Sequence, residues 1–177
     1  MALEEVGAAV RRARAVLERR PDMGLHDDAP ASARWEGGTR IVASHANGTQ
    51  VVTDMPAELG GGGDRVTPGW MFRAGFASCA ATSIAIHAAE EGIELTALEV
   101  VAGSRSDTRG LLGMSEPSGE RVYAGPGDVR LRVRIAARGA RPGRLHALVE
   151  RSLRCSPIPN AVERALPVAI AIDVEAG

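Results

Sequence analysis

The sequence contains no lysine, and its 21 basic residues other than histidine are all arginine. Without lysine the protein can form neither a Walker-type phosphate loop nor a Schiff base with a carbonyl substrate. A general base built on a lysine amine is excluded for the same reason. The absence therefore removes several classes of nucleotide-binding and carbonyl-processing enzyme.

Apolar runs long enough for a membrane span are also missing. A helix needs about 20 apolar residues to cross a bilayer, and no stretch of the 177 residues approaches that length. The amino terminus has acidic Glu4 and Glu5 where a secretory signal peptide has basic residues. We therefore expect a cytoplasmic protein that does not bind membranes. Its net charge of -1 is evenly spread, so nucleic acid is not an expected partner.

Only two cysteines are present, Cys79 and Cys155, and in a reducing cytoplasm they are not expected to form a permanent disulfide. The histidines lie at isolated positions without metal-ligand spacing, so we expect no metal site. His87 shares a helical face with Cys79 but lies two turns away, about 12 Å at ~1.5 Å per residue. That separation is too long for a hydrogen bond within one helix, so His87 is interpreted as structural or surface-exposed.

A chain of this length favours one domain with its own core. Residues 3–20 carry apolar side chains at helical spacing. We assign residues 1–22 to this amino-terminal helix, which packs on the body or on a partner subunit, and residues 23–177 to the rest of the same domain. Asn47-Gly48 favours a tight hairpin turn. Further helices are expected at 68–91 and 141–154, and strands at 31–36, 39–45, 50–53, 95–107, 129–137 and 167–174.

The helix at 68–91 begins with Thr67 and Pro68, residues favoured at a helix cap and first turn. Apolar residues cover nearly its whole circumference, so we expect it to be buried, with Cys79 inside. Cys79 follows Pro68 by roughly 16 Å along the axis at ~1.5 Å per residue. The amino terminus of its own helix is therefore too distant to stabilise its thiolate.

Two interpretations of the cysteines stay open from the residues alone. In one, a peroxidatic thiolate attacks an oxidant, and a resolving thiol captures the resulting sulfenic acid as a disulfide. In the other, both cysteines are small buried apolar residues without chemistry. The first needs a cation from another element near the thiolate. Arg40 is a candidate, whereas Arg73 is poorly placed on the helix of Cys79.

Several segments, taken in order, resemble the OsmC/Ohr family of hydroperoxide-reducing proteins, in its broader OsmC-like branch. They are ARWEGGTR, DMPAELGGG, TPGWMFRAGFASC followed by AIHAAEEGIEL, SDTRGLLG, and RCSPIPNAV with PVAIAI. Their order and the interval from Pro68 to Cys79 match the family. The resemblance spans about residues 31–174.

The resemblance implies an α+β, two-layer fold, with strongly curved antiparallel sheets around two central helices. It implies an intertwined homodimer with active sites at the subunit interface. Cys79 would be the peroxidatic thiol, Cys155 the resolving thiol and Arg40 the arginine that pairs with the thiolate. An apolar substrate pocket would be lined by aromatic side chains, namely Trp70, Phe72 and Phe76.

The activity implied is thiol-dependent reduction of small hydrophobic organic hydroperoxides. A dithiol, in some members a lipoylated protein, would recycle the enzyme, and no metal or organic cofactor would take part. The sequence departs from the family at Gly69, where the peroxidases carry a glutamate that holds the arginine. Arg40 lies one residue after the Gly-Gly-Arg position, and Cys155 is followed by Ser156-Pro157 rather than directly by proline.

Gly69 favours an alternative, a non-catalytic OsmC-like dimer that binds a hydrophobic small molecule on its apolar helix surface. A purely structural, stress-associated protein is a third interpretation that the sequence allows.

Overall fold

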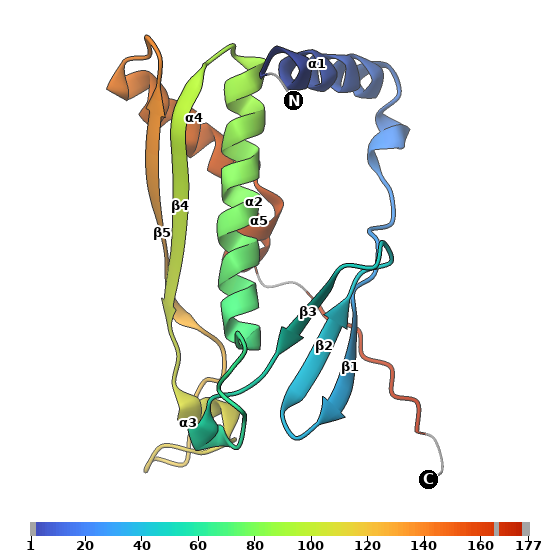
Figure 1. Cartoon of the computed structure of the whole chain (residues 1–177), viewed down its shortest axis with the longest axis vertical. Helices are drawn as coiled ribbons and strands as arrows, with labels where there is room; N and C mark the ends of the chain where they lie inside the picture. The colour runs from blue at the N-terminus through green and yellow to red at the C-terminus, as the bar shows by residue number, and fades with distance from the viewer. Residues whose placement is uncertain (1–2, 165–166, 175–177) are drawn as a thin grey trace.

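The computed structural model describes residues 3–164 and 167–174 (Figure 1). Within those ranges the chain forms two antiparallel sheets and five α-helices, which confirms the α+β class. The helices are α1 (Leu3–Arg19), α2 (Pro68–Glu90), α3 (Thr108–Leu111), α4 (Pro142–Arg154) and α5 (Pro157–Glu163), with 3-10 turns η1 (Pro21–Gly24) and η2 (Ala57–Leu59). The strands are β1 (Ser32–Gly37), β2 (Arg40–Ser44), β3 (Gln50–Thr53), β4 (Leu95–Arg105) and β5 (Gly127–Ala137).

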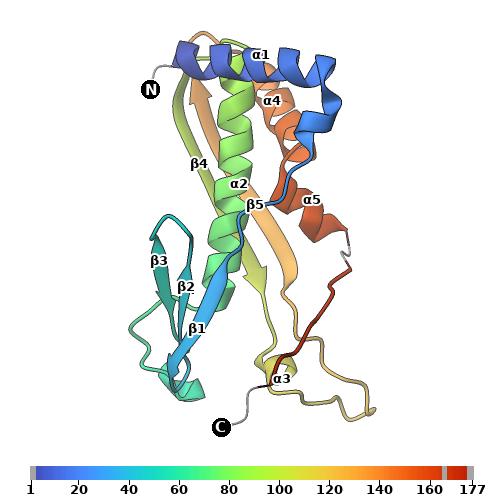
Figure 2. The same cartoon turned by 90° about the vertical axis from the view of Figure 1, so that its right-hand side faces the viewer.

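The long strands β4 and β5 form a two-stranded sheet that supports the central helix. Val100 lies opposite Val133, and Leu98 lies opposite Ile135. Because side chains alternate along a strand, these residues share an apolar face, and the arginines of β5 share the other. Helix α2 runs alongside this pair in both views (Figure 1, Figure 2). The buried core joins α2 to α4 through Ile84, Ala88, Ile93, Leu145 and Leu148.

The second sheet, in the order β1-β2-β3, is a meander that follows the sequence prediction within one or two residues. It lies beside the amino-terminal half of α2 rather than against β4 and β5 (Figure 1). A glycine-rich segment connects β3 to Thr67, whose side chain accepts a hydrogen bond from the backbone N–H of Trp70 and caps α2. The predicted cap and first turn of α2 are confirmed.

Helix α1 crosses the carboxyl end of α2 (Figure 1, Figure 2). Gly7 is buried there, and a Cβ at this position would lie 2.4 Å from the carbonyl oxygen of Ala89. Arg14 forms an ion pair with Glu90 at 2.7 Å. The contact requires glycine because the two backbones approach too closely for any larger residue.

Helix α2 is not buried all round, which corrects the sequence prediction. Phe76, Ala80, Ser83, Ile84 and Ala88 are buried, while Ser78, Thr82, Ala85 and Ile86 are exposed. The body of a single chain covers α2 where it faces β4, α1, α4 and α5. One side of the helix, which includes the apolar Ala85 and Ile86, therefore remains uncovered.

Residues 167–174 do not form the predicted strand, so this prediction is wrong for the single chain. Val168, Ile170 and Ile172 are each 80% exposed, and Val174 is 87% exposed. A strand needs the backbone N–H and C=O groups of a neighbouring edge. Among the described residues no strand pairs with this segment.

Helices α3 and α5 were not predicted. Helix α3 lies between β4 and β5, and α5 begins two residues after Cys155. In the ranges that the structure describes, no helix combines the length and apolarity required to span a bilayer.

Candidate functional site

The sulfur of Cys79 lies against the first turn of α5. The backbone N–H of Ile158 donates to Cys79 Sγ at 3.5 Å, and Ser156 Oγ lies 3.3 Å from the same sulfur. The Ser156 hydroxyl can donate to a thiolate, which only accepts. One backbone donor and one hydroxyl that can donate thus lie at the sulfur, where the sequence had suggested an arginine.

Ser156 is fully buried at the junction of α4 and α5. It stands at the N-cap position of α5, yet its side chain makes no cap hydrogen bond. The hydroxyl instead contacts Cys79. Ser156 therefore stands at the start of α5 with its backbone, while its side chain contacts the Cys79 thiol.

Cys155 is exposed and caps the carboxyl end of α4. Both cysteines are free thiols. The structure does not bring their sulfurs into a bond, although Cys155 immediately precedes Ser156 in the chain. The resolving role of Cys155 stays a prediction.

Arg40 lies in an acidic network on the β1-β2-β3 sheet. Its Nη2 donates to Asp54 Oδ2 at 3.0 Å and to Asp64 Oδ1 at 2.5 Å. Because of these two carboxylates, the hydrogen bond to Asp54 first, the pKa of Arg40 is raised. Gly69 supplies no acid, so Asp54 and Asp64 are the partners that the sequence comparison did not find.

Asp54 is buried, with 3% of its surface exposed, and is the centre of this network. Its carboxylate accepts from the Thr39 hydroxyl at 2.6 Å and from the backbone N–H groups of Gly62 at 3.0 Å and Met55 at 2.8 Å. The Thr39 hydrogen bond, followed by that of Gly62, holds the pKa of Asp54 well below its usual range. The carboxylate is thus ionised and ties the glycine-rich segment to β2.

Arg40 and Cys79 form no hydrogen bond with each other in the described chain. Arg40 sits on the meander, whereas Cys79 faces α5. Both hydrogen bonds of Arg40 leave from Nη2, and among residues 3–164 and 167–174 neither Nε nor Nη1 donates. The predicted pairing of Arg40 with the thiolate stays a prediction.

The three aromatic candidates lie on the first three turns of α2. Phe72 and Phe76 stack with ring centroids 6.2 Å apart, and Phe76 is 7% exposed. Trp70 is 48% exposed. The phenylalanines form a packed pair, while the indole of Trp70 is available at the surface near the start of the helix.

His87 is held away from the thiol. Its Nδ1 lies 3.0 Å from Ser152 Oγ, and that hydroxyl donates to the carbonyl of Leu148 at 2.7 Å. Because the hydroxyl proton points at Leu148, His87 Nδ1 carries a proton and donates. This contact agrees with the interpretation of His87 as a structural residue. Arg73 donates to Ser104 Oγ at 3.4 Å and is directed toward β4.

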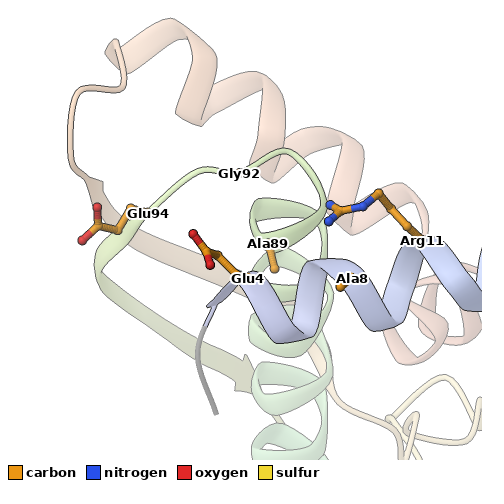
Figure 3. Close-up of a pocket in the computed structure, with 6 residues that line it drawn as sticks. All are labelled: Glu4, Ala8, Arg11, Ala89, Gly92 and Glu94. Atoms are coloured by element: carbon orange, nitrogen blue, oxygen red, sulfur yellow. The ribbon is translucent and has the colours of Figure 1, made fainter.

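A cavity of about 720 Å³ opens where α1 meets the turn after α2 (Figure 3). It is lined by side chains of both charges and small residues, namely Glu4, Ala8, Arg11, Ala89, Gly92 and Glu94. Ala89 follows Cys79 by about 15 Å along α2 at ~1.5 Å per residue. The cavity therefore belongs to the α1 contact and not to the thiol. No cluster of three metal-ligating side chains occurs within the described ranges.

The family model described as OsmC-like protein matches residues 61–171, well over half of the chain. The chain belongs to the OsmC family. The matched segment contains both cysteines, the helices α2 and α4, and the long hairpin β4–β5. The family resemblance inferred from the sequence is confirmed.

Solved structures show the same OsmC fold. The OsmC-like protein of Mycoplasma pneumoniae has a TM-score of 0.65 at 14% identity, covering 80% of this chain and 91% of its own. An organic hydroperoxide resistance protein from Elizabethkingia anophelis has a TM-score of 0.57 at 18% identity, covering 80% of this chain and 91% of its own. A protein from Legionella pneumophila described as organic hydroperoxide resistance protein OsmC has a TM-score of 0.53 at 23% identity, covering 78% of this chain and 90% of its own. No curated protein matches the chain in sequence.

Sequence reasoning missed Ser156 and Ile158, the residues of this OsmC chain that contact the Cys79 sulfur. Ser156-Pro157 has the same cap-and-first-turn signature as Thr67-Pro68, and this signal could have located α5. That the first turn of α5 contacts Cys79 could not be found from spacing. The two segments are 77 residues apart.

Proposed function

We propose that this OsmC protein reduces organic hydroperoxides with Cys79 as the attacking thiol. The observation that carries the proposal is the contact of Cys79 Sγ with the Ile158 N–H, which donates to it, and with the Ser156 hydroxyl, which can donate once the sulfur is a thiolate. Donors that favour the charged form lower the energy of a thiolate, and the thiolate is the nucleophile. The names of the Elizabethkingia and Legionella structures support hydroperoxides as the oxidant class.

The reaction begins when the thiolate attacks the terminal oxygen of the hydroperoxide. A sulfur–oxygen bond forms and the oxygen–oxygen bond breaks, so the sulfur is oxidised to sulfenic acid. The leaving alkoxide takes up a proton and departs as the alcohol. A dithiol then returns the sulfur to the thiol state, which requires no metal or organic cofactor.

We further propose that the active unit is a homodimer. Helix α2 leaves apolar surface uncovered at Ile86, and residues 167–174 expose an alternating apolar strand sequence. The Arg40 of a second copy, already oriented by Asp54 and Asp64, would supply the cation for Cys79. Trp70, Phe72 and Phe76 would bind the apolar part of the hydroperoxide.

The test is hydroperoxide consumption by the full chain with dithiothreitol. The Cys79→Ser variant is expected to lose the activity, because the attacking sulfur is gone. The Ser78→Ala variant is the matched control, since it alters the exposed neighbouring residue and keeps the thiol. Equal consumption by wild type and Cys79→Ser would refute the proposal.

A second candidate function is a non-catalytic dimer that holds a hydrophobic small molecule. A groove of about 490 Å³ between β5 and α4 favours it, lined mainly by Leu131, Val133, Ile135, Leu145, Val149 and Leu153. The rate of Cys79 alkylation against pH separates the two. A thiol that stays reactive below its usual pKa of about 8.5 supports catalysis, and an ordinary or raised pKa supports binding.

A further inference from the structure

Ser156, and not Cys155, is the residue of the α4–α5 junction that faces the thiol. Its Oγ lies 3.3 Å from Cys79 Sγ, and it is fully buried. Cys155 is exposed. A serine therefore occupies the place from which a second thiol would attack an oxidised Cys79.

A disulfide has narrow geometric limits. The sulfurs must come to about 2.05 Å, with the Cβ atoms about 3.5–4.5 Å apart. The groups of the α4–α5 junction that contact Cys79 Sγ are the Ser156 hydroxyl and the Ile158 N–H, and Cys155 is not among them. Cys155 can reach the sulfur only if the junction turns and Ser156 leaves.

The junction is held in place by hydrogen bonds. The backbone N–H of Cys155 donates to the Ser152 carbonyl at 3.1 Å, and that of Ser156 donates to the Leu153 carbonyl at 3.1 Å. Asn160 adds a clamp, because its Nδ2 lies within hydrogen-bonding distance of three carbonyls, those of Leu153 at 3.3 Å, Arg154 at 3.0 Å and Ser156 at 2.8 Å. If the junction rotated to bring Cys155 toward Cys79, these hydrogen bonds would have to break.

We propose that Cys79 works as a single redox cysteine, whose sulfenic acid is held beside Ser156 and is reduced by an external dithiol without Cys155. This inference rests on the proposed hydroperoxide reduction. The Ser156 hydroxyl can donate to the sulfenic oxygen or accept its proton. Since serine cannot form a disulfide, the intermediate persists until an outside thiol arrives.

The reduction step is balanced by one dithiol. Its first thiolate attacks the sulfur of the sulfenic acid, a sulfur–sulfur bond forms and the sulfur–oxygen bond breaks, and the hydroxide that leaves takes up the proton released by the dithiol and becomes water. Its second thiolate attacks the external sulfur of this mixed disulfide. The Cys79 thiolate is released, and the dithiol is oxidised to its disulfide.

The test starts with one equivalent of cumene hydroperoxide and no dithiol. Wild type is expected to accept a dimedone label on Cys79 and to form no disulfide between Cys79 and Cys155, within or between chains. With dithiothreitol, the Cys155→Ser variant should turn over within about twofold of wild type. A Cys79–Cys155 disulfide in wild type overturns the inference.

Loss of turnover in Cys155→Ser, with Cys79 still oxidised once, also overturns this inference and leaves hydroperoxide reduction intact. Failure of Cys79 to be oxidised by the hydroperoxide would instead refute the proposed function, and the inference with it. The two failures are thus distinguished by the labelling of Cys79.

A thiol placed at the serine position tests the geometry directly. In a Cys155→Ser background, Ser156→Cys should form a disulfide with Cys79 when hydroperoxide is added. Ser152→Cys is the matched control, because Ser152 is also fully buried but contacts His87. It should form none. A disulfide from the control and not from Ser156→Cys would overturn the assignment of Ser156.

Discussion

Arg40 donates to Asp54 across the meander, from Nη2 to Oδ2 at 3.0 Å. The carboxylate that receives it is buried, and it also accepts from Thr39 and from the backbone of the glycine-rich segment. Asp54 and Asp64 thus hold the arginine through Nη2 alone. Asp54, which directly follows β3, thus gives Arg40 the carboxylate partner that Gly69 cannot provide.

The charge of Asp54 makes this network sensitive to acid. Its folded pKa is lowered, so the ionised form stabilises the fold fully above the unfolded value of about 3.9 and the contribution is lost as pH falls below it. Asp54→Asn should therefore lower the melting temperature at pH 7. The difference from wild type should shrink progressively as the pH falls below about 4, because the unfolded wild-type chain then takes up a proton at Asp54 while the folded carboxylate is still ionised.

Thermal melts of both proteins across this pH range check the prediction. Asp27→Asn is the control, because Asp27 is an exposed carboxylate. A pH-independent difference between Asp54→Asn and wild type would show that the charge of Asp54 does not carry the effect.

Local signals predicted much of this fold, but contacts distant in sequence escaped them. The Thr67-Pro68 cap, the Asn47-Gly48 turn and the alternation of β5 each placed an element within a few residues. Each depends on neighbouring residues only. The partners of Arg40 lie 14 and 24 residues away and follow from strand register and loop closure, which no local pattern encodes.

The error at residues 167–174 has a different origin. The alternating sequence correctly indicates a segment suited to a strand, but a strand also needs an edge to pair with. Among the described residues of the single chain, no strand edge pairs with this segment. Cys79 is a third case, since its helix was predicted, while the contact with Ser156 depends on how α5 packs against α2.

Gly7 should be essential for the packing of α1 against α2. A methyl group there would meet the Ala89 carbonyl oxygen at 2.4 Å, and backbone on both sides must shift to admit it. Gly7→Ala is expected to destabilise the fold by about 1–3 kcal/mol, the usual cost of overpacking. Urea unfolding at equilibrium measures the change.

Gly143→Ala is the matched control, since a Cβ at this helical position in α4 meets no atom within 4 Å. It should be neutral or stabilise by up to about 1 kcal/mol, because alanine favours a helix more than glycine does. Equal losses in the two variants would argue against a tight α1–α2 contact.

The exposed segment 167–174 leads to a prediction about assembly. If it pairs as a strand with a second copy, Ile170 and its alternate neighbours face the apolar side of the joint sheet. Ile170→Asp should then weaken the dimer at least tenfold, measured by sedimentation equilibrium, since burying an unpaired charge is costly. Ala169→Asp places the same charge on the opposite face and should have a smaller effect. A monomeric wild type, or equal effects of both charges, would contradict the pairing.

Asn160 should determine which residue faces Cys79. Its side-chain amide is aimed at three carbonyls at the end of α4, and the Ser156 carbonyl also accepts from its backbone N–H at 3.1 Å. Asn160→Ala removes only the side-chain clamp and frees the junction to turn. After one equivalent of hydroperoxide without dithiol, the variant should form a Cys79–Cys155 disulfide that wild type does not form.

Peptide mapping under non-reducing conditions detects that bond. Asn47→Ala, in the hairpin turn between β2 and β3, serves as the control and should behave as wild type, because Asn47 bonds only within its own turn. If Asn160→Ala keeps Cys79 as a sulfenic acid with Cys155 reduced, the clamp is not what separates the two sulfurs. The exposed position of Cys155 at the end of α4 would then be sufficient by itself to keep the thiols apart.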